Sequence, residues 1–489
     1  MIPKLKIFID PLLKDKYGAE ICWIWRLLLT SIGYTWEEVL PEDSECDIAY
    51  VSELEKCKNC KLWARAEINY WGKRDDLQLE GFREFEGLSY PLFKGKASPE
   101  TAFLENDGQV LCLRDIVFDA FWLITGQQEK YLSKNKHGFF DLSDTTIFTS
   151  QVLRSALSSR IGSWLEERLL GLGFSSPFPR WPRGKRAAAC LSHDVDYPEV
   201  KRIVEPLRII GRQGLSGLGA AVAVLQGKKK HWHFSSWVEM EKKLGLRSAF
   251  YFSPAQGSVL KFLFGIPDPF YDVKSQKFRK LFKYLTDEGF EIGLHSSYLA
   301  FESEEKFANE RQILQQCTGQ EIYGNRHHYW HLNPDDIEST LMLHEKIGFK
   351  YDSSLIHERY LGWRRGLVWP FFPFHRAERR QLKTLQISPT WMDDQLFGHL
   401  KHNPGDRFKN LQAIIELAAE AKGCVVVDIH QYVFDDTLFP DWRQIYLWFM
   451  ENLIGRSDFW IGTPGEIADH WIKRYSSILD DSVGLREGF

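Results

Sequence analysis

In the second part of the chain, short apolar runs alternate with longer segments in which apolar residues recur every three or four positions. The first pattern is typical of buried strands and the second of amphipathic helices. The pattern predicts strands at 187–193, 248–252, 290–294, 322–326, 384–388, 424–429 and 458–461, and helices at 274–288, 303–317, 334–347, 407–422 and 441–454. Repeated strand–helix units form parallel sheets, so this region is predicted to be a closed or nearly closed (β/α) barrel.

The first part of the chain shows the same alternation over fewer elements. Strands are predicted at 5–9 and 47–51, and helices at 20–31 and 152–171. No glycine-rich loop follows the first strand, so no nucleotide site is predicted. Residues 174–186 are rich in Pro, Gly and Ser and cannot continue a helix or a central strand. The sequence therefore predicts two domains: an α/β domain of unknown role over 1–180, and the barrel over 181–489.

Composition narrows the function classes. The 489 residues exceed the size of one ordinary core, and 44% hydrophobic with 26% charged residues is normal for a soluble globular protein. The net charge of -4 argues against a nucleic-acid partner. No apolar signal sequence or membrane-spanning run is found, and the eight scattered cysteines fit reduced thiols. We therefore expect a cytoplasmic protein. Aromatic residues reach 14%, which is typical of sugar-binding clefts and also of plain core packing.

Polar residues follow the predicted strands of the barrel at one end. The first strand leads into Asp194 and Asp196, the third into His295, the fourth into Arg326, and a late strand into His430. In a barrel, residues at the carboxyl ends of the strands converge on one cleft. A charged group is costly there unless it is paired or bound to a metal, so these residues predict an active site.

These residue types fit hydrolysis of an acyl group. One Asp and one His with a third ligand could hold a divalent metal such as zinc, which polarises an acyl oxygen and lowers the pKa of a bound water to about 7. A second Asp could take a proton from the water, and an adjacent guanidinium would keep that Asp ionised. A His on the opposite wall could protonate the leaving amine.

The ordered set resembles the polysaccharide deacetylases of carbohydrate esterase family 4, over roughly residues 187–470. The segments that carry the resemblance are Ser192-His193-Asp194-Val195-Asp196, Glu291-Ile292-Gly293-Leu294-His295-Ser296, Arg326-His327-His328-Tyr329 and Ile429-His430. The resemblance implies that Asp194 is the catalytic base, Asp196 and His295 are metal ligands, and Arg326 orients the base. It also implies that the Tyr329 backbone N–H donates to the oxyanion and that His430 is the catalytic acid.

The sequence departs from the family at one metal ligand. The second metal histidine of the family, four residues after His295, is replaced by Leu299. His328 is the best substitute, because it would share a strand face with Arg326, whereas His327 would point away. Metal dependence stays open, since allantoinase-like members of the branch with a D-V-D motif are thought to work without a conventional metal site. The segment Pro389–Asp394 also resembles the part of that branch whose aspartate, here Asp393, supports the catalytic histidine.

The predicted function is removal of an acetyl group from an N-acetylated or O-acetylated sugar or polysaccharide precursor, with a divalent metal such as zinc as cofactor. Two alternatives remain. One is a metal-independent amidase acting on a small substrate with a C–N bond, and the other is a catalytically inactive, carbohydrate-binding descendant. The substrate class comes from the resemblance alone.

Overall fold

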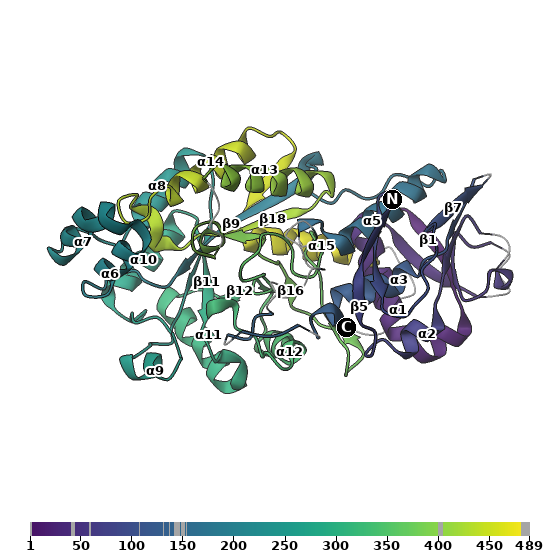
Figure 1. Ribbon diagram of the computed structural model, residues 1–489, viewed down its shortest axis with the longest axis horizontal. Helices are drawn as coiled ribbons and strands as arrows, with labels where there is room; N and C mark the ends of the chain where they lie inside the picture. The colour runs from purple at the N-terminus through teal and green to yellow at the C-terminus, as the bar shows by residue number, and fades with distance from the viewer. Residues whose placement is uncertain are drawn as a thin grey trace.

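The computed structural model describes residues 2–480 except 41–44, 58, 59, 107, 131, 136, 141–146, 148–151, 153 and 400–403. It contains two large sheets, one formed by strands that precede the Pro-rich segment 174–186 in the sequence and the other by strands that follow it. In Figure 1 the two parts lie side by side along the longest axis, with the first part in purple and blue and the second in teal to yellow.

The first part is built on a sheet of six strands in the order β2-β1-β3-β4-β8-β7. All neighbours are parallel except β7 and β8. The strands are β1 Lys4–Ile9, β2 Thr35–Val39, β3 Ile48–Val51, β4 Leu62–Arg65, β7 Phe103–Asn106 and β8 Gln109–Cys112, with a separate hairpin of β5 Leu79–Phe85 and β6 Leu88–Phe93. Its helices are α1 Pro11–Ile32, α2 Ile68–Gly72, α3 Ile116–Ile124 and α5 Leu157–Gly171.

The first helix begins earlier than the periodicity predicted. Asp10 caps α1 by accepting a hydrogen bond from the Leu12 N–H, and a proline stands at the start of the helix, where its missing N–H costs nothing. Capping and proline position therefore extended α1 back to Pro11 from the predicted residue 20. Helix α5 instead begins later than predicted, at Leu157.

The second part is built on a curled parallel sheet, which confirms the predicted α/β fold of barrel type. The order is β16-β13-β12-β11-β10-β9-β18-β17, with β19 also paired to β9. The strands are β9 Ala187–Val195, β10 Ala249–Phe252, β11 Glu291–Ser296, β12 Gly324–His327, β13 Tyr351–Asp352, β16 Leu385–Gln386, β17 Trp391–Met392, β18 Cys424–Asp428 and β19 Phe459–Gly462, with a small hairpin of β14 Phe374–His375 and β15 Arg380–Gln381. All nine residues of β9 are buried, as expected for a central parallel strand covered on both faces.

The sheet does not close through hydrogen bonds between its end strands, β16 and β17. The chain itself closes the ring instead. The Ile387 N–H donates to the Asp352 carbonyl beside one edge, and the Thr390 N–H donates to the Val426 carbonyl beside the other. The four residues between β16 and β17 therefore join the two edges, which gives a distorted barrel and keeps the carboxyl ends of the parallel strands around one opening.

Helices surround this sheet (Figure 1). They are α6 Glu205–Gln213, α7 Leu218–Leu225, α8 Phe234–Lys243, α9 Val259–Leu263, α10 Gln276–Asp287, α11 Glu304–Thr318, α12 Ile337–Ile347, α13 Pro404–Glu420, α14 Trp442–Ile454 and α15 Pro464–Asp480. The predicted helices match α10 to α14, whereas α6 to α9 and α15 were not predicted. Within the residues that the structure describes, no helix is both long and apolar enough to cross a membrane.

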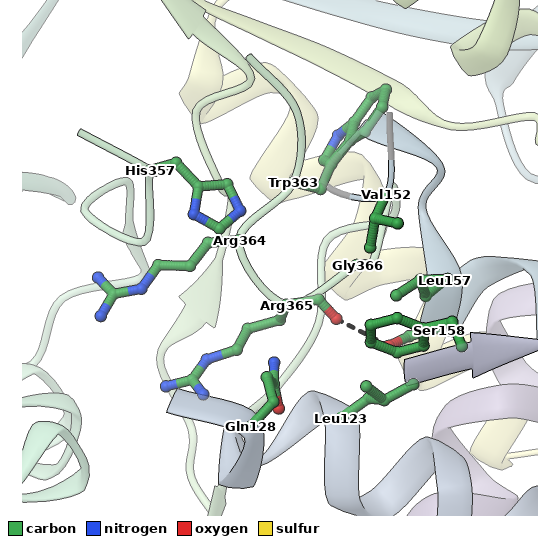
Figure 2. A pocket seen from close by; sticks show the side chains of 11 residues that line it. Leu123, Gln128, Val152, Leu157, Ser158, His357, Trp363, Arg364, Arg365 and Gly366 are labelled. Atoms are coloured by element: carbon green, nitrogen blue, oxygen red, sulfur yellow. Dashed lines mark hydrogen bonds between the residues drawn. The ribbon is translucent and has the colours of Figure 1, made fainter. Parts of the chain in front are cut away.

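The interface between the two parts, which we call the seam, contains both polar and apolar contacts. Glu166 of α5 accepts hydrogen bonds from Arg180 and Lys422, both at 2.6 Å. A loop of the second part lies against the start of α5, where the Ser158 hydroxyl donates to the Arg365 carbonyl at 2.7 Å (Figure 2). Buried apolar residues of both parts also form one continuous cluster. The two parts are therefore tightly docked, and their folding as separate domains stays a prediction.

Limited proteolysis tests the predicted boundary near residue 180. Arg183 is exposed and has a positive φ of 57°, whereas Arg180 is buried. We expect trypsin to cut the native protein after Arg183 before it cuts after Arg180, and the two fragments to remain associated through the seam. Mass spectrometry of the first products checks this. A digest in which no early cut falls within 172–186 would contradict the boundary.

Candidate active site

The carboxyl ends of the parallel strands bring the predicted residues together. Strand β9 ends next to Asp196, β11 carries His295, and β12 carries Arg326, while β17 and β18 end just before Asp393 and Ile429-His430. All of these strands run parallel. Their polar residues therefore emerge at the same edge of the sheet, in mutual contact.

Asp194 is held by a buried arginine. The Arg326 Nη1 lies 2.9 Å from Asp194 Oδ1, and both side chains are almost completely buried. Burial alone would raise the pKa of Asp194, but the positive charge of Arg326, together with smaller contributions from the two nearby histidines, leaves the pKa below its ordinary value. Asp194 is therefore an ionised carboxylate at neutral pH, which is the form that a general base requires.

Asp428 is a second acidic partner of this arginine, and the sequence analysis missed it. Its Oδ1 lies 3.1 Å from Arg326 Nη1, and its side chain is fully buried. Burial, reinforced by the negative charge of Asp194, raises the pKa of Asp428 well above its ordinary value. This shift favours the neutral form of Asp428 and so leaves more of the charge of Arg326 for Asp194. The signal for Asp428 was weak, because it lies within an apolar strand pattern.

Three residues converge on a possible cation site. Asp196 Oδ1 lies 3.2 Å from His295 Nε2 and 3.6 Å from His328 Nε2, and all three side chains are buried. Two ligands of a tetrahedral ion with bonds near 2.1 Å are separated by about 3.4 Å. The observed separations lie on either side of that value. The three side chains are thus spaced as the protein ligands of a zinc-like ion.

The hydrogen bonding of His295 also supports a cation site. His295 Nδ1 lies 2.9 Å from the Arg326 carbonyl, so this nitrogen carries a proton and donates it. In the neutral ring, Nε2 then presents a lone pair to Asp196 Oδ1, which is unfavourable unless a cation or a proton lies between them. A metal-binding histidine commonly donates its other N–H to a backbone carbonyl in this way.

His328 reaches the site by a different route from the one predicted. Strand β12 ends at His327, and His328 opens the short 3-10 turn His328–Trp330. His328 nevertheless reaches Asp196, and its Nδ1 lies 3.6 Å from Asp268 Oδ1. Burial lowers the pKa of His328, but the charges of Asp196 and Asp268 raise it to about 9, and the same negative field attracts a metal cation.

The neighbouring residues fall outside the cluster. His327 points away, as predicted, and its Nε2 lies 2.8 Å from His344 Nε2 in the interior. Leu299 stands just before the 3-10 turn Ala300–Glu302 and offers no ligand atom. The loop residue Asp268 was missed, because no strand pattern precedes it.

A second acid–base pair, His430 and Asp393, lies beside Asp196. His430 Nδ1 lies 2.8 Å from Asp393 Oδ1, and the His430 backbone N–H donates to Asp393 Oδ2 at 2.7 Å. Burial opposes protonation, but the charge of Asp393, together with Tyr432 and the contact with Asp196, raises the pKa of His430 well above its ordinary value. His430 Nε2 lies 3.5 Å from Asp196 Oδ2, so it faces the cluster as an imidazolium able to give up a proton.

Tyrosines line the mouth of the site. Tyr197, Tyr329 and Tyr432 are each partly exposed. Tyr432 lies 5.3 Å from both His430 and Tyr197, measured between ring centroids. Tyr329 has a positive φ of 56°, a strained conformation of the kind found at functional sites. The wide aromatic faces are suited to stacking on a sugar ring.

The first part of the chain also reaches this mouth. His137 Nδ1 lies 2.9 Å from the Tyr298 hydroxyl, and the His137 ring lies 5.1 Å from that of Tyr329. Nearby, the Phe139 and Trp330 rings are 6.3 Å apart. The segment around His137 therefore forms part of the rim of a site whose chemistry comes from the second part, and no sequence signal indicated it.

Comparison with known proteins gives a weak likeness. No protein-family model and no curated protein matches the chain. A probable polysaccharide deacetylase from Pseudomonas aeruginosa matches with 16% identity over 62% of this chain and 97% of its own, at a TM-score of 0.41. A structure assigned to a polysaccharide deacetylase of Mycobacterium smegmatis matches with 15% identity over 60% and 93%, at 0.40. A peptidoglycan deacetylase from Bacillus subtilis matches with 11% identity over 62% and 98%, at 0.27. Solved structures of polysaccharide deacetylases are thus similar to this chain, but identities and TM-scores this low support no conclusion about function.

Metal titration tests the role of His328. We expect the native protein to bind one zinc ion per chain, and His328→Ala to weaken the affinity by roughly 10²-fold or more, because two protein ligands hold zinc poorly. Isothermal titration with zinc after chelator treatment measures this. His331→Ala is the matched control, since His331 is also buried but contacts the Tyr298 carbonyl. Equal affinity in native protein and His328→Ala would contradict the assignment.

Proposed function

We propose that the protein is a hydrolase that removes an acetyl group from an N-acetylated or O-acetylated sugar or polysaccharide precursor. One observation carries the proposal. A carboxylate kept ionised by Arg326 and an imidazolium kept charged by Asp393 face the Asp196 cluster from two sides. A base and an acid around a common centre are what acyl transfer to water requires.

Asp194 is the base in this mechanism. Arg326 fixes its Oδ1, so Oδ2, which lies 3.7 Å from His295 Nε2, faces the cluster. From there it removes the proton of the attacking water. Asp196, His295 and His328 would hold the divalent cation, which when bound polarises the acyl oxygen and acidifies the water. The Tyr329 backbone N–H, in its strained turn, is the proposed donor to the developing oxyanion.

His430 is the acid. Its Nδ1 is fixed on Asp393, which leaves the proton on Nε2 directed at the cluster. Protonation of the leaving nitrogen lets the C–N bond break and releases acetate and a free amine. The need for such an acid favours an N-acetyl group, because an amine is a poorer leaving group than an alkoxide unless it is protonated. The tyrosines at the mouth would hold the sugar ring.

The metal-independent amidase is the remaining rival, and the leucine at position 299 favours it. Removal of metal distinguishes the two functions. A metal-dependent deacetylase loses activity in a chelator and regains it with zinc, whereas the rival is unaffected. An inactive carbohydrate-binding descendant is disfavoured, because binding alone does not need a paired base and acid.

Acetate release from N-acetylglucosamine oligomers and other acetylated sugars tests the function. We expect turnover by the native protein and a loss of about 10²–10⁴-fold in kcat for Asp194→Asn, since the amide cannot accept the proton. The fold should survive, because the amide oxygen still accepts a hydrogen bond from Arg326 and Asp428 can take up the charge. Circular dichroism checks the fold. Equal kcat in the variant and the native protein would show that Asp194 is not the base.

A second variant tests the contribution of the first part of the chain. We expect His137→Ala to raise KM severalfold with little change in kcat, because His137 contacts the Tyr298 hydroxyl and the ring of Tyr329, neither of which is proposed to transfer protons or hold the cation. His233→Ala, on the outer side of the barrel against Phe434, is the control. A fall in kcat at unchanged KM would show that His137 does not contribute to substrate binding.

A further inference from the structure

One end of the barrel part exposes an unusual concentration of apolar side chains. Of the 22 exposed large hydrophobic residues among those described, 12 lie in two short segments, 203–225 and 260–264. They are Ile203, Val204, Leu207, Ile210, Leu215, Leu218, Val222 and Leu225 around α6 and α7, and Leu260, Phe262, Leu263 and Phe264 in and after α9. We call these residues the apolar end. Concentrations of exposed apolar side chains mark interaction surfaces.

The exposure of the apolar end is extreme at its tips. Leu215 is 84% exposed, Leu263 75% and Phe264 77%. These residues pack on nothing that would repay the cost of holding apolar side chains in water. In Figure 1, α6 and α7 lie at the end of the longest axis that is farthest from the first part of the chain, and α9 lies below them on the lower edge of the same half. The seam between the two parts therefore leaves the apolar end free.

Positive charge surrounds the apolar end, against the negative balance of the whole chain. Between Tyr197 and His233 there are seven Lys or Arg and two Glu, whereas the whole chain carries a net charge of -4. Both glutamates are already paired, Glu205 with Arg212 at 2.7 Å and Glu199 with Lys277 at 2.8 Å. Arg202, Lys228 and Lys230 are exposed. The local field is therefore positive.

The apolar end is continuous with the active site. The segment that leads to α6 starts directly after Asp196, and Arg208 of α6 lies over the ring of Tyr197 at the mouth. The segment that contains α9 runs on to Asp268, beside His328. Lys201 links the two segments, because its ammonium lies 3.9 Å from the Phe270 ring centre and 5.0 Å from that of Tyr197. Whatever binds the apolar end therefore lies next to the entrance.

We propose that the apolar end docks on a lipid bilayer that carries anionic headgroups. Short amphipathic segments that combine Leu, Ile, Val and Phe with flanking Lys and Arg are typical of helices lying in a membrane interface. Protein interfaces instead favour Tyr, Trp and Arg at their centres and are depleted in Lys. The apolar tips would enter the acyl boundary while the basic residues meet the headgroups.

Docking in this way specifies the kind of substrate, and this step rests on the proposed function. A site held at the bilayer surface takes an acetylated sugar attached to a membrane lipid more readily than a free sugar. The lipid tail would stay in the bilayer beside the apolar end, and the sugar would reach the tyrosines at the mouth. Membrane binding itself does not depend on catalysis, so the two claims are separable.

Vesicle sedimentation with the full chain tests the docking. The probes are vesicles of phosphatidylcholine alone and vesicles with one quarter phosphatidylglycerol. We expect binding to the anionic vesicles that weakens in high salt. Leu215→Asp combined with Leu263→Asp should reduce the partition coefficient at least about tenfold, because two charges replace two inserted side chains. The double variant Arg202→Glu with Lys228→Glu should reduce the partition coefficient on anionic vesicles by about fivefold or more for each of the two residues changed.

The control places the same change elsewhere. Leu12→Asp with Leu170→Asp alters two exposed leucines of the first part of the chain, at 62% and 42% exposure, and should leave binding unchanged. No binding to either vesicle, or equal binding by the Leu215/Leu263 variant, overturns the proposal. A native dimer in sedimentation velocity that dissociates in the Leu215/Leu263 variant also overturns it, because the apolar end would then contact a second copy of the chain.

Acetate release separates the substrate claim from the proposed function. An N-acetylglucosamine linked to a long alkyl chain in anionic vesicles is compared with the same sugar on a short soluble chain. We expect kcat/KM at least about tenfold higher for the vesicle substrate, and loss of that advantage in the Leu215/Leu263 variant. Equal kcat/KM for both substrates overturns the lipid-linked substrate. If neither substrate is hydrolysed but the protein still binds vesicles, the proposed deacetylase function is overturned and the membrane docking stands.

Discussion

The buried charge of Arg326 is the interaction on which the rest of the site depends. Its guanidinium contacts Asp194 and Asp428, and also the hydroxyls of Ser192 and Ser353 at 2.9 and 3.0 Å. An unpaired guanidinium in this position would be prohibitively costly, so each of these groups must be in place before the arginine can be buried. The strands β9, β12 and β18 and the segment after β13 are therefore tied to one point.

The same arginine also sets the chemistry around it. Its carbonyl fixes the tautomer of His295, and its charge lowers the pKa of Asp194, whereas burial raises the pKa of Asp428. Asp393 supports the charged form of His430 as Arg326 supports the charged form of Asp194. Two oppositely charged supports thus hold a base and an acid in opposite protonation states around Asp196. That separation of pKa values is the physical basis of the proposed reaction.

The parts of the molecule away from the sheet decide what can reach this chemistry. The first part of the chain contributes His137 to the rim, and the loops after β9 and β10 form the apolar end beside the entrance. Three segments therefore border the site, namely the segment around His137 and the loops after β9 and β10. An acetylated sugar held on a lipid would satisfy all three at once, with its ring at the tyrosines and its tail at the apolar end.

The sequence by itself determined the barrel part and the residues at its strand ends. Parallel strands must present their carboxyl ends at one edge, so local pattern alone predicted that Asp194, Asp196, His295, Arg326 and His430 would meet. The tertiary structure alone decided the contacts made by loops and by strand residues that look apolar in context. Asp268 and His137 approach the site through folded loops, and Asp428 is hidden in an apolar run. The leucines of α6 and α7 have the pattern of buried residues, and only their exposure in the folded chain shows that they face outward. Hydrophobic periodicity records that a face must be covered, but it does not record by what.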